Sequence, residues 1–352
     1  MFDLTVVGAG LSGLSLARRA AALGLETVVL EARTRVGGRV LGHRTGAGTY
    51  DLGPAWVWPT LQPRIATLAA SAGLTLTVQM EAGGFIYQDA AGRTQPLASG
   101  FPQEPPSMRI VGGITALVDA LAAHLPPGTL RLGHVVHRVE LAASHLIVTA
   151  ATDDGPLSLR TARVALAVPP RLIGRIEIQP ALPGSIVSAL AGIPGWMANQ
   201  AKALALYDRP VWRASGLSGS AFSQAGPLGE IHDASLTGAA EESALFGFFA
   251  WPASLRAARR TELADRVAQQ LGSLFGPDAA RPRDIVIQDW AREPFTASDA
   301  DLAAGTTHPD YRAISLPAPW GDRILLAGSE VAPEFGGYLE GALAAAEATR
   351  LE

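Results

Sequence analysis

The stretch "DLTVVGAGLSGLSLARRAAALGLETVVLEA", residues 3–32, decides the fold. Residues 3–7 form a short apolar run that ends at a glycine, which is typical of a buried parallel strand. Residues 11–24 carry leucine and alanine at helical spacing and stop at Gly24, and residues 27–32 are apolar again. Strand, helix and strand within about thirty residues predict a right-handed βαβ unit, which requires a parallel sheet.

The glycines of the first turn follow the G-x-G-x-x-G pattern of dinucleotide-binding proteins. Gly8 permits the tight turn, Gly10 lets a pyrophosphate approach the backbone, and Gly13 lets the helix pack on the strand. The free N–H groups at the start of the helix favour phosphate. Glu31, at the end of the second strand, is placed to accept hydrogen bonds from ribose hydroxyls and to repel a 2′-phosphate.

A second glycine pair follows in "EARTRVGGRV", residues 31–40. Gly37 and Gly38 allow close backbone approach, and Arg39 directly after them supplies a planar cation with several donors for a phosphate. Arg35 lies nearby and is expected to be a solvated surface side chain. We therefore expect Arg39 to contact the cofactor.

Composition excludes several classes of protein. The 352 residues have a formal net charge of −4, with no run of basic residues, which argues against nucleic-acid binding. The absence of cysteine excludes disulfides, thiolate metal sites and a thioether link to a cofactor, and the seven histidines form no metal-binding pattern. No apolar run is long enough to span a membrane. Because the chain enters a core strand almost at once, we expect no signal peptide and a cytoplasmic location.

The length predicts two domains, one of them interrupted by the other. Residues 1–59, 108–170 and 318–352 are expected to form an α/β, Rossmann-like dinucleotide-binding domain. Residues 60–107 and 171–317 are expected to form a smaller, discontinuous α+β substrate domain on a mixed or antiparallel sheet. Further strands are expected at 134–141, 162–168, 201–207, 284–290 and 323–328, and further helices at 112–125, 254–276 and 340–352.

Lys202 is the only lysine, although lysine and arginine together total 28. In "AKALALY", residues 201–207, strand alternation puts Lys202, Leu204 and Leu206 on one face. A lysine that shares a face with leucines points inward or along a domain boundary. Burial can lower the pKa of a lysine until it loses its proton, whereas arginine stays charged. We therefore expect Lys202 to be buried at the domain boundary with a shifted pKa; the alternative is a solvated surface cation.

Four segments together resemble the flavin-containing amine oxidases. They are residues 6–40, the "DLG" segment at 50–60, the lysine strand with its Pro-x-Trp at 193–219, and the closing motif at 323–348. They follow the order of the family and cover most of the chain. The resemblance implies that the dinucleotide is FAD.

The resemblance also implies which positions bind the cofactor. Ser12 and Arg39 would contact the pyrophosphate, Glu31 and Arg33 the adenosine side, and the backbone of Val136 the adenine. The full set of implied cofactor-binding positions is Gly8, Gly10, Ser12, Gly13, Glu31, Arg33, Gly38, Arg39, Gly53, Ala55, Trp56, Val136, Gly328, Glu330, Gly337, Leu339 and Ala342.

At the flavin end the resemblance implies a reaction. Gly53, Ala55 and Trp56 would lie along the isoalloxazine edge, Glu330 would hold the ribityl chain, and the backbone of Leu339 would reach the pyrimidine ring. The family moves a hydride from the carbon bearing nitrogen to flavin N5. The resulting imine becomes a carbonyl compound and ammonia, and O2 or another acceptor takes the electrons, O2 giving H2O2.

The resemblance implies three catalytic positions. Lys202 would hold a water against flavin N5, Tyr338 would be one of two aromatic rings flanking the path to the flavin, and Trp290 would lie near the flavin. For Trp290 and Trp56, the filling of a core is the alternative.

The chain departs from the family at three places. The second ring falls near Ala300, so Phe295, Tyr311 or a tryptophan within 56–58 would have to replace it. The position of a flavin-linking cysteine falls near Asp299, which predicts non-covalent FAD. The segment between "DLG" and residue 109 is short, which predicts an open pocket or one that a protein partner covers.

Two other functions compete with amine oxidation. One is desaturation of a C–C bond or ring by a flavoenzyme of the same superfamily, which does not call for the lysine. The other is a flavoprotein subunit that acts on a partner-bound substrate.

Overall fold

The N-terminal strand, helix and strand form the centre of the first domain, as predicted. The computed structural model describes residues 1–100, 103–237, 242–303, 305 and 307–351. β1 (Phe2–Val7) and β2 (Thr27–Leu30) pair in parallel on either side of the connection through α1 (Leu11–Ala22). Leu4, Val6 and Leu14 are fully buried. This burial explains why such a short apolar run becomes a central strand.

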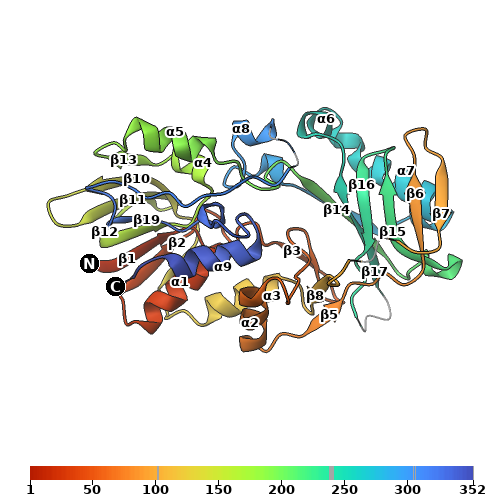
Figure 1. Cartoon of the computed structure of the whole chain (residues 1–352), viewed down its shortest axis with the longest axis horizontal. Coiled ribbons are helices and arrows are strands. Elements are labelled where there is room, and N and C mark those ends of the chain that lie inside the picture. Colours follow the sequence, from red (N-terminus) through yellow and green to blue (C-terminus); the bar gives the residue numbers. More distant parts are fainter. Residues whose placement is uncertain (101–102, 238–241, 304, 306, 352) are drawn as a thin grey trace.

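The first sheet has eight strands in the order β13, β10, β11, β12, β1, β2 and β9, with β19 paired to β12. Its remaining bounds are β9 (Leu130–Arg131), β10 (Val135–Leu141), β11 (Leu146–Thr152), β12 (Gly155–Leu166), β13 (Glu177–Gln179) and β19 (Ile324–Leu326). Figure 1 shows α1 and α9 (Leu339–Ala348) on one side of this sheet and α4 (Pro170–Ile173) and α5 (Gly184–Gly192) on the other. The expected Rossmann-like α/β domain is confirmed.

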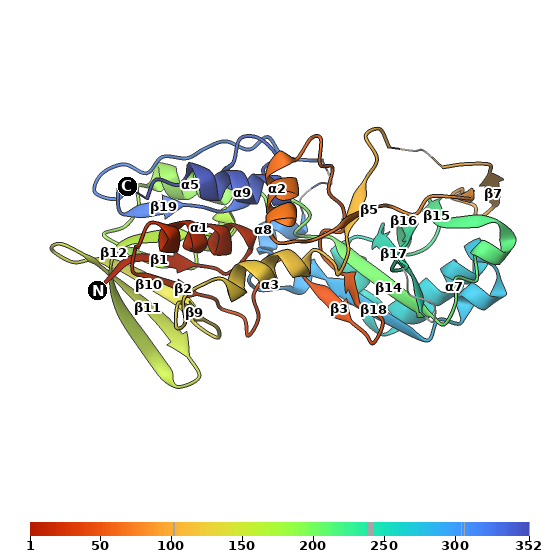
Figure 2. The same ribbon diagram turned by 90° about the horizontal axis from the view of Figure 1, so that it is seen from below.

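The second sheet has seven strands in the order β18, β14, β17, β16, β15, β6 and β7. Their bounds are β6 (Gly84–Gln88), β7 (Thr94–Leu97), β14 (Ala201–Tyr207), β15 (Leu217–Ser223), β16 (Leu228–Asp233), β17 (Ser243–Phe249) and β18 (Asp284–Asp289). All pairs are antiparallel except β15 with β6, so the sheet is mixed, as expected. In Figure 2 this sheet lies at the end of the molecule opposite the two termini.

The two faces of the second sheet have different neighbours. One face carries Ala203, Ala205 and Tyr207 and packs on α7 (Leu263–Phe275), whose Leu263, Val267, Leu271 and Leu274 recur at helical spacing. The other face carries Leu204 and Leu206 and packs on Tyr50, Leu52 and Ala55 of the dinucleotide-binding domain. The face predicted for Lys202 therefore faces the domain boundary.

Short elements connect the two sheets. Two pairs of strands lie near the junction, β3 (Gly42–Arg44) with β4 (Thr49–Asp51) and β5 (Leu76–Val78) with β8 (Met108–Ile110). The connecting helices are α2 (Pro63–Ser71), α3 (Thr115–Ala123) and α8 (Asp299–Leu302).

Segments expected in the substrate domain join the first domain instead at two places. β13 pairs with β10, and Ile173, Ile178 and Leu190 are buried in the core of the first sheet. Ile65 of α2 is buried in the core that α1 and α9 share. These apolar side chains find their partners far away in the sequence, so local composition did not reveal the boundary.

The prediction of one continuous helix over residues 254–276 is wrong. It consists of α6 (Ala253–Ala258), a 3₁₀ turn (Arg260–Glu262) and α7. Buried Arg256 donates to both carboxylate oxygens of Asp289 at 2.9 and 2.7 Å, which ties α6 to the end of β18. The final helix ends at Ala348 rather than at residue 352, which lies outside the described residues.

Candidate active site

One cavity of about 580 Å³ runs from the glycine loop of the first domain to the lysine strand of the second. Gly10 and Glu31 line it at one end, and Lys202 and Phe248 line it at the other. Its volume lies in the range of cofactor and small-molecule sites. All the predicted site residues line this cavity except Gly13 and Glu330.

In the glycine loop, Gly8 and Gly13 leave no room for a side chain, whereas Gly10 between them does. Gly8 has a φ of +103°, and a Cβ on Gly13 would lie 2.0 Å from the carbonyl oxygen of Gly8. Gly13 therefore lets α1 pack closely on β1, the role expected of it. A Cβ on Gly10 would instead meet no atom closer than 3.9 Å. The free space at Gly10 belongs to the cavity, which fits the close approach of a pyrophosphate.

Glu31 holds the glycine loop in place from the end of β2. Its carboxylate accepts hydrogen bonds from the backbone N–H of Ala9 at 2.7 Å and of Arg33 at 2.9 Å. The Arg33 side chain donates to Thr296 at 2.9 Å and stacks over Phe295 at 5.5 Å. The wall predicted from the sequence to face the adenosine is therefore polar and held by hydrogen bonds.

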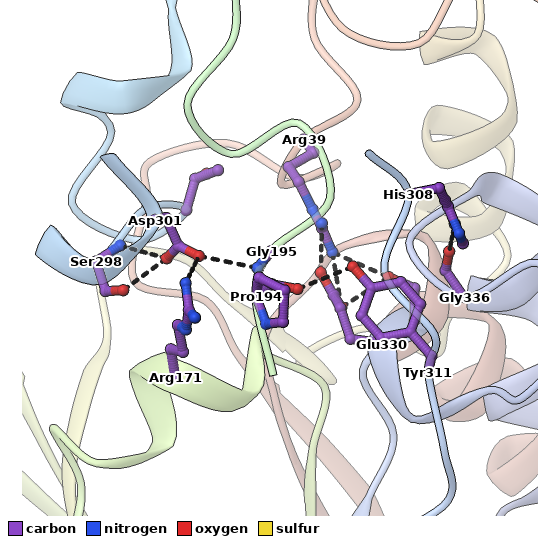
Figure 3. A network of polar contacts seen from close by, with 12 residues as sticks. Arg39, Arg171, Pro194, Gly195, Ser298, Asp301, His308, Tyr311, Glu330 and Gly336 are labelled. Carbon is purple, nitrogen blue, oxygen red and sulfur yellow. Dashed lines mark hydrogen bonds and ion pairs between the residues drawn. The ribbon is translucent and has the colours of Figure 1, made fainter. Parts of the chain in front are cut away.

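Arg39 lines the cavity and is held by a buried carboxylate behind it. Its guanidinium donates to both oxygens of Glu330, at 2.5 and 3.1 Å, and to the hydroxyl of Ser329 at 3.0 Å (Figure 3). Burial lowers the pKa of Arg39, but the charge of Glu330 outweighs it and the pKa is raised, so Arg39 stays a cation. Glu330 is fully buried and lies outside the cavity lining, and it positions Arg39.

The hydroxyl of Ser12 donates to the carbonyl of Ala327 at the end of β19. This contact ties the start of α1 to the closing motif. A hydrogen bond therefore connects the N-terminal glycine motif to the C-terminal closing motif at the wall of the cavity.

Lys202 lies at the junction of the two sheets with only 2% of its surface exposed. Its Nζ donates to the carbonyl oxygen of Gly53 at 2.7 Å and of Asp51 at 3.2 Å, both in the "DLG" segment. It also lies 4.4 Å from the ring centroid of Phe246 and 5.1 Å from that of Phe248. A surface-cation role is thereby excluded.

A buried charge cluster surrounds this lysine. Burial lowers the pKa of Lys202 to about 7, the charge of Asp51 opposes the shift, and Arg109 adds to it. Burial likewise raises the pKa of Asp51 to about 6, against the charges of Arg109 and Lys202. Asp51 Oδ1 accepts from the N–H of Ile114 at 2.8 Å, and Oδ2 is buried without a hydrogen-bond partner. Sequence analysis missed Asp51 and Arg109, since no local pattern marks charges that come close together from separate strands.

Tyr338 and Trp196 form an aromatic wall of the cavity. Their ring centroids are 6.1 Å apart, and His308 stacks on Tyr338 at 5.1 Å. Figure 3 shows how the loop before Trp196 is fixed: Tyr311 donates to the carbonyl of Pro194 at 2.8 Å, and Gly195 donates to Asp301 at 2.9 Å. Trp196 was not predicted, although it stands six residues before Lys202.

The expected substitutes for the missing second ring have different positions. Phe295 lines the cavity beside Arg33, and Tyr311 is buried outside the lining. Trp56 lines it close to Lys202, 6.0 Å from Phe248 between centroids, and donates from Nε1 to Gln79 at 2.9 Å. Trp290 also lines it, and its Nε1 donates to the carbonyl of Leu52 at 3.2 Å.

Two kinds of feature are absent from the described residues. No cluster of three or more histidine, aspartate or glutamate side chains in them could hold a metal ion. No helix among them is long and apolar enough to cross a membrane.

The fold and the cavity together define a class: a protein with a Rossmann-like dinucleotide-binding domain whose cavity runs from the glycine loop to a second sheet. Comparison with known proteins then identifies the family. Residues 96–349 match the flavin containing amine oxidoreductase model, and residues 6–72 match the NAD(P)-binding Rossmann-like domain. The chain belongs to the flavin-containing amine oxidoreductase family, and it is an FAD-dependent enzyme.

Individual relatives agree with this assignment. The chain is 30% identical over 240 residues to the probable flavin-containing monoamine oxidase A of Dictyostelium discoideum, covering 67% of this chain and 50% of that protein. It is 26% identical to a putative flavin-containing monoamine oxidase of Mycobacterium tuberculosis, covering 97% of this chain and 94% of the relative. The solved structure of putrescine oxidase bound to putrescine superposes with a TM-score of 0.80 at 21% identity, covering 98% and 97% of the two chains, which shows the shared fold.

Proposed function

We propose that this chain oxidises an amine at the carbon bearing the nitrogen and uses O2 as the final electron acceptor. The observation that carries the proposal is the single cavity that joins the glycine loop to a buried Lys202. FAD fits this cavity because Gly10 leaves space for a pyrophosphate and Arg39 lines the wall as a preorganised cation. Glu31 would hold the ribose side, and Gly53 and Trp56 would lie along the flavin.

When bound, FAD would supply the acceptor for a hydride, and O2 would take the two electrons together with two protons to give H2O2. The walls near Lys202 are aromatic, namely Trp56, Phe248 and Tyr338. An apolar wall disfavours the ammonium form of a substrate, so it promotes the neutral amine whose C–H bond can be broken. The chain therefore contributes desolvation and orientation at this end of the cavity.

Lys202 can accept a proton from the cavity in its neutral form and donate one to it in its protonated form. A neutral amine has two N–H donors, and the carbonyls of Asp51 and Gly53 accept both. Its lone pair is then left for a water or a substrate proton in the cavity. The protonated form has a third N–H at the same place. With a pKa of about 7, both forms are populated near neutral pH.

The imine formed in the site would be hydrolysed there by water to a carbonyl compound and ammonia. Lys202 would orient the water for this step or assist the transfer of electrons to O2. Neither role is open to an arginine, whose guanidinium is larger and stays charged.

The test is anaerobic mixing of the yellow holoenzyme with a panel of amines while the flavin absorbance is followed. Amine oxidation predicts bleaching by some amines, recovery in air and formation of H2O2. Lys202→Met should slow bleaching or recovery at least tenfold, and Leu204→Met, on the same face of β14, is the matched control. Bleaching by a dihydro-aromatic compound and by no amine would instead establish the desaturase alternative.

Non-covalent attachment of FAD is part of the proposal. It is supported by the absence of cysteine from the whole sequence. Acid precipitation should release all of the yellow colour into the supernatant, and colour left in the pellet would contradict it. The cytoplasmic location and a protein partner over the cavity stay predictions, which fractionation and size measurement would test.

A further inference from the structure

Gln62 is a buried glutamine whose side-chain NH2 group has no acceptor among the described residues. It stands at the start of α2 with 4% of its surface exposed, and it lines the cavity. Its Oε1 accepts a hydrogen bond from the backbone N–H of Trp58 at 3.2 Å. Since that N–H can only donate, it fixes which end of the amide is the oxygen. The two N–H donors of Nε2 are therefore left for a ligand in the cavity.

The turn before α2 holds this amide in place. The backbone N–H groups of Leu61 and Gln62 donate to the carbonyl of Trp58 at 2.9 and 2.8 Å. The indole N–H of Trp58 in turn donates to the side chain of Gln103 at 3.0 Å. Because the backbone and the Oε1 of Gln62 are both anchored, its side chain loses little conformational freedom when a ligand binds.

A chain of aromatic contacts leads from this turn to the lysine end of the cavity. Trp58 lines the cavity with its ring centroid 6.4 Å from that of Trp56. Trp56 lies 6.0 Å from Phe248 between centroids, and the Phe248 ring is 5.1 Å from Lys202 Nζ. The free donors of Gln62 thus belong to the part of the cavity where the reaction is proposed to occur.

The first turn of α9 lies next to the first turn of α2. Glu340 accepts hydrogen bonds from the backbone N–H of Arg64 at 3.1 Å and of Ile65 at 3.0 Å, which joins the two helix starts (Figure 2). Among the described residues no side chain caps the N-terminus of α9, and Leu339 at its start lines the cavity. This helix start offers free N–H groups and the positive end of a helix dipole to the same region as Gln62.

A helix start and a buried amide together suit a ligand edge that consists of acceptors and gains negative charge. An amine substrate in its ammonium form has only donors, so it is not such a group. The N1–C2 edge of the pyrimidine ring of a flavin has a ring nitrogen and a carbonyl oxygen, and two-electron reduction places negative charge on it. Hydrogen bonds and charges near the flavin ring nitrogens tune its electronics.

We propose that the Gln62 amide donates a hydrogen bond to the N1–C2 edge of the flavin and raises its reduction potential. The inference rests on the proposed function only for the placement of FAD in this cavity, with the flavin at the lysine end. The hydrogen bond is neutral with oxidised flavin and charge-assisted with reduced flavin, so it is stronger after reduction. Gln62 therefore makes the flavin a better hydride acceptor and takes no part in bond breaking.

The experiment measures the two-electron reduction potential of the holoenzyme under anaerobic conditions against a reference dye, with dithionite as the reductant and no amine present. Gln62→Met keeps the length of the side chain and removes the donor. It should lower the equilibrium constant for flavin reduction about tenfold, which is about 30 mV for a two-electron couple. Gln62→Glu keeps the acceptor for Trp58 and, once ionised at alkaline pH, replaces the donor by a negative charge. Its potential should fall at least as far below that of wild type at the same pH.

Gln103→Met is the matched control. Gln103 is an exposed glutamine that also contacts Trp58, but it does not line the cavity. Its replacement should leave the potential at the wild-type value. A Gln62→Met enzyme with the wild-type potential would overturn the inference. An equal fall in Gln103→Met would overturn it as well, because the effect would then arise from the position of Trp58.

This measurement is independent of the proposed function, because dithionite and not an amine reduces the flavin. If Gln62→Met lowers the potential but no amine bleaches the wild-type flavin, the proposed function fails and the role of Gln62 stands. If amines bleach the flavin and Gln62→Met keeps the wild-type potential, amine oxidation stands and Gln62 has no role at the flavin.

Discussion

Replacing Lys202 with methionine should change how the stability of the protein depends on pH. The buried lysine has its pKa lowered from 10.5 to about 7, chiefly by burial. Between these values the unfolded chain binds a proton that the folded chain does not, so the wild type becomes more stable as pH rises. From pH 7.5 to 9.5 it should gain roughly 2.5 kcal/mol relative to Lys202→Met.

The size of the effect at any single pH is a poor test. Methionine removes the cost of burying an amine, but it also leaves the carbonyls of Asp51 and Gly53 without their donor, at about 1–3 kcal/mol each. The change of the stability difference with pH isolates the contribution of proton binding by Lys202. The assay is urea unfolding of the holoprotein with excess FAD at several pH values, with Leu204→Met as the control whose difference from wild type should not vary with pH.

A direct measurement is available because the chain has one lysine. Protein grown with ¹³C-labelled lysine should give one lysine ε-carbon resonance, and its titration reports the pKa of Lys202. A midpoint near 10.5, together with a pH-independent stability difference, would refute the placement of an uncharged lysine beside the cavity.

Four further variants test the cofactor wall and the charge cluster. Gly10→Ala should fold normally, because its Cβ meets no atom within 3.9 Å, yet bind FAD at least about tenfold more weakly; Gly13→Ala, with a Cβ 2.0 Å from a carbonyl oxygen, should lose about 1–3 kcal/mol of stability in urea unfolding. Arg39→Ala leaves buried Glu330 without its cation and should cost about 3–5 kcal/mol, read as a lowered Tm that excess FAD does not restore. Asp51→Asn removes the negative charge that raises the pKa of Lys202, so that pKa should fall and the acid limb of the pH–activity profile should move to lower pH.

The glycine turn at one end of the cavity could be predicted from the sequence. Gly8, Gly10, Gly13 and Glu31 stand within one βαβ unit, and their spacing alone places them around one turn. The face of Lys202 was also predictable, because strand alternation is a local rule and Leu204 and Leu206 report which side is buried. Local backbone geometry determines both results.

The wall opposite the lysine could not be predicted in the same way. Phe248 lies beside Lys202, and Glu230 beside Phe248, only because β14, β17 and β16 pair in one register, and a shift by one residue would turn these side chains to the other face. Trp196 reaches Tyr338 because Tyr311 and Asp301 hold its loop from distant segments. These contacts join residues that are far apart in the sequence, so no local pattern predicts them.

By itself, then, the sequence determined the dinucleotide-binding unit, the strand of Lys202 and the absence of a cysteine link, all of which depend on neighbours along the chain or on composition. Only the tertiary structure decided that β13 and α2 belong with the first domain, that α6 and α7 are separate, and that Asp51 and Arg109 surround the lysine. The reason is physical: burial and charge pairing are properties of residues that meet in space, and the register and packing that bring them together are settled by the whole chain.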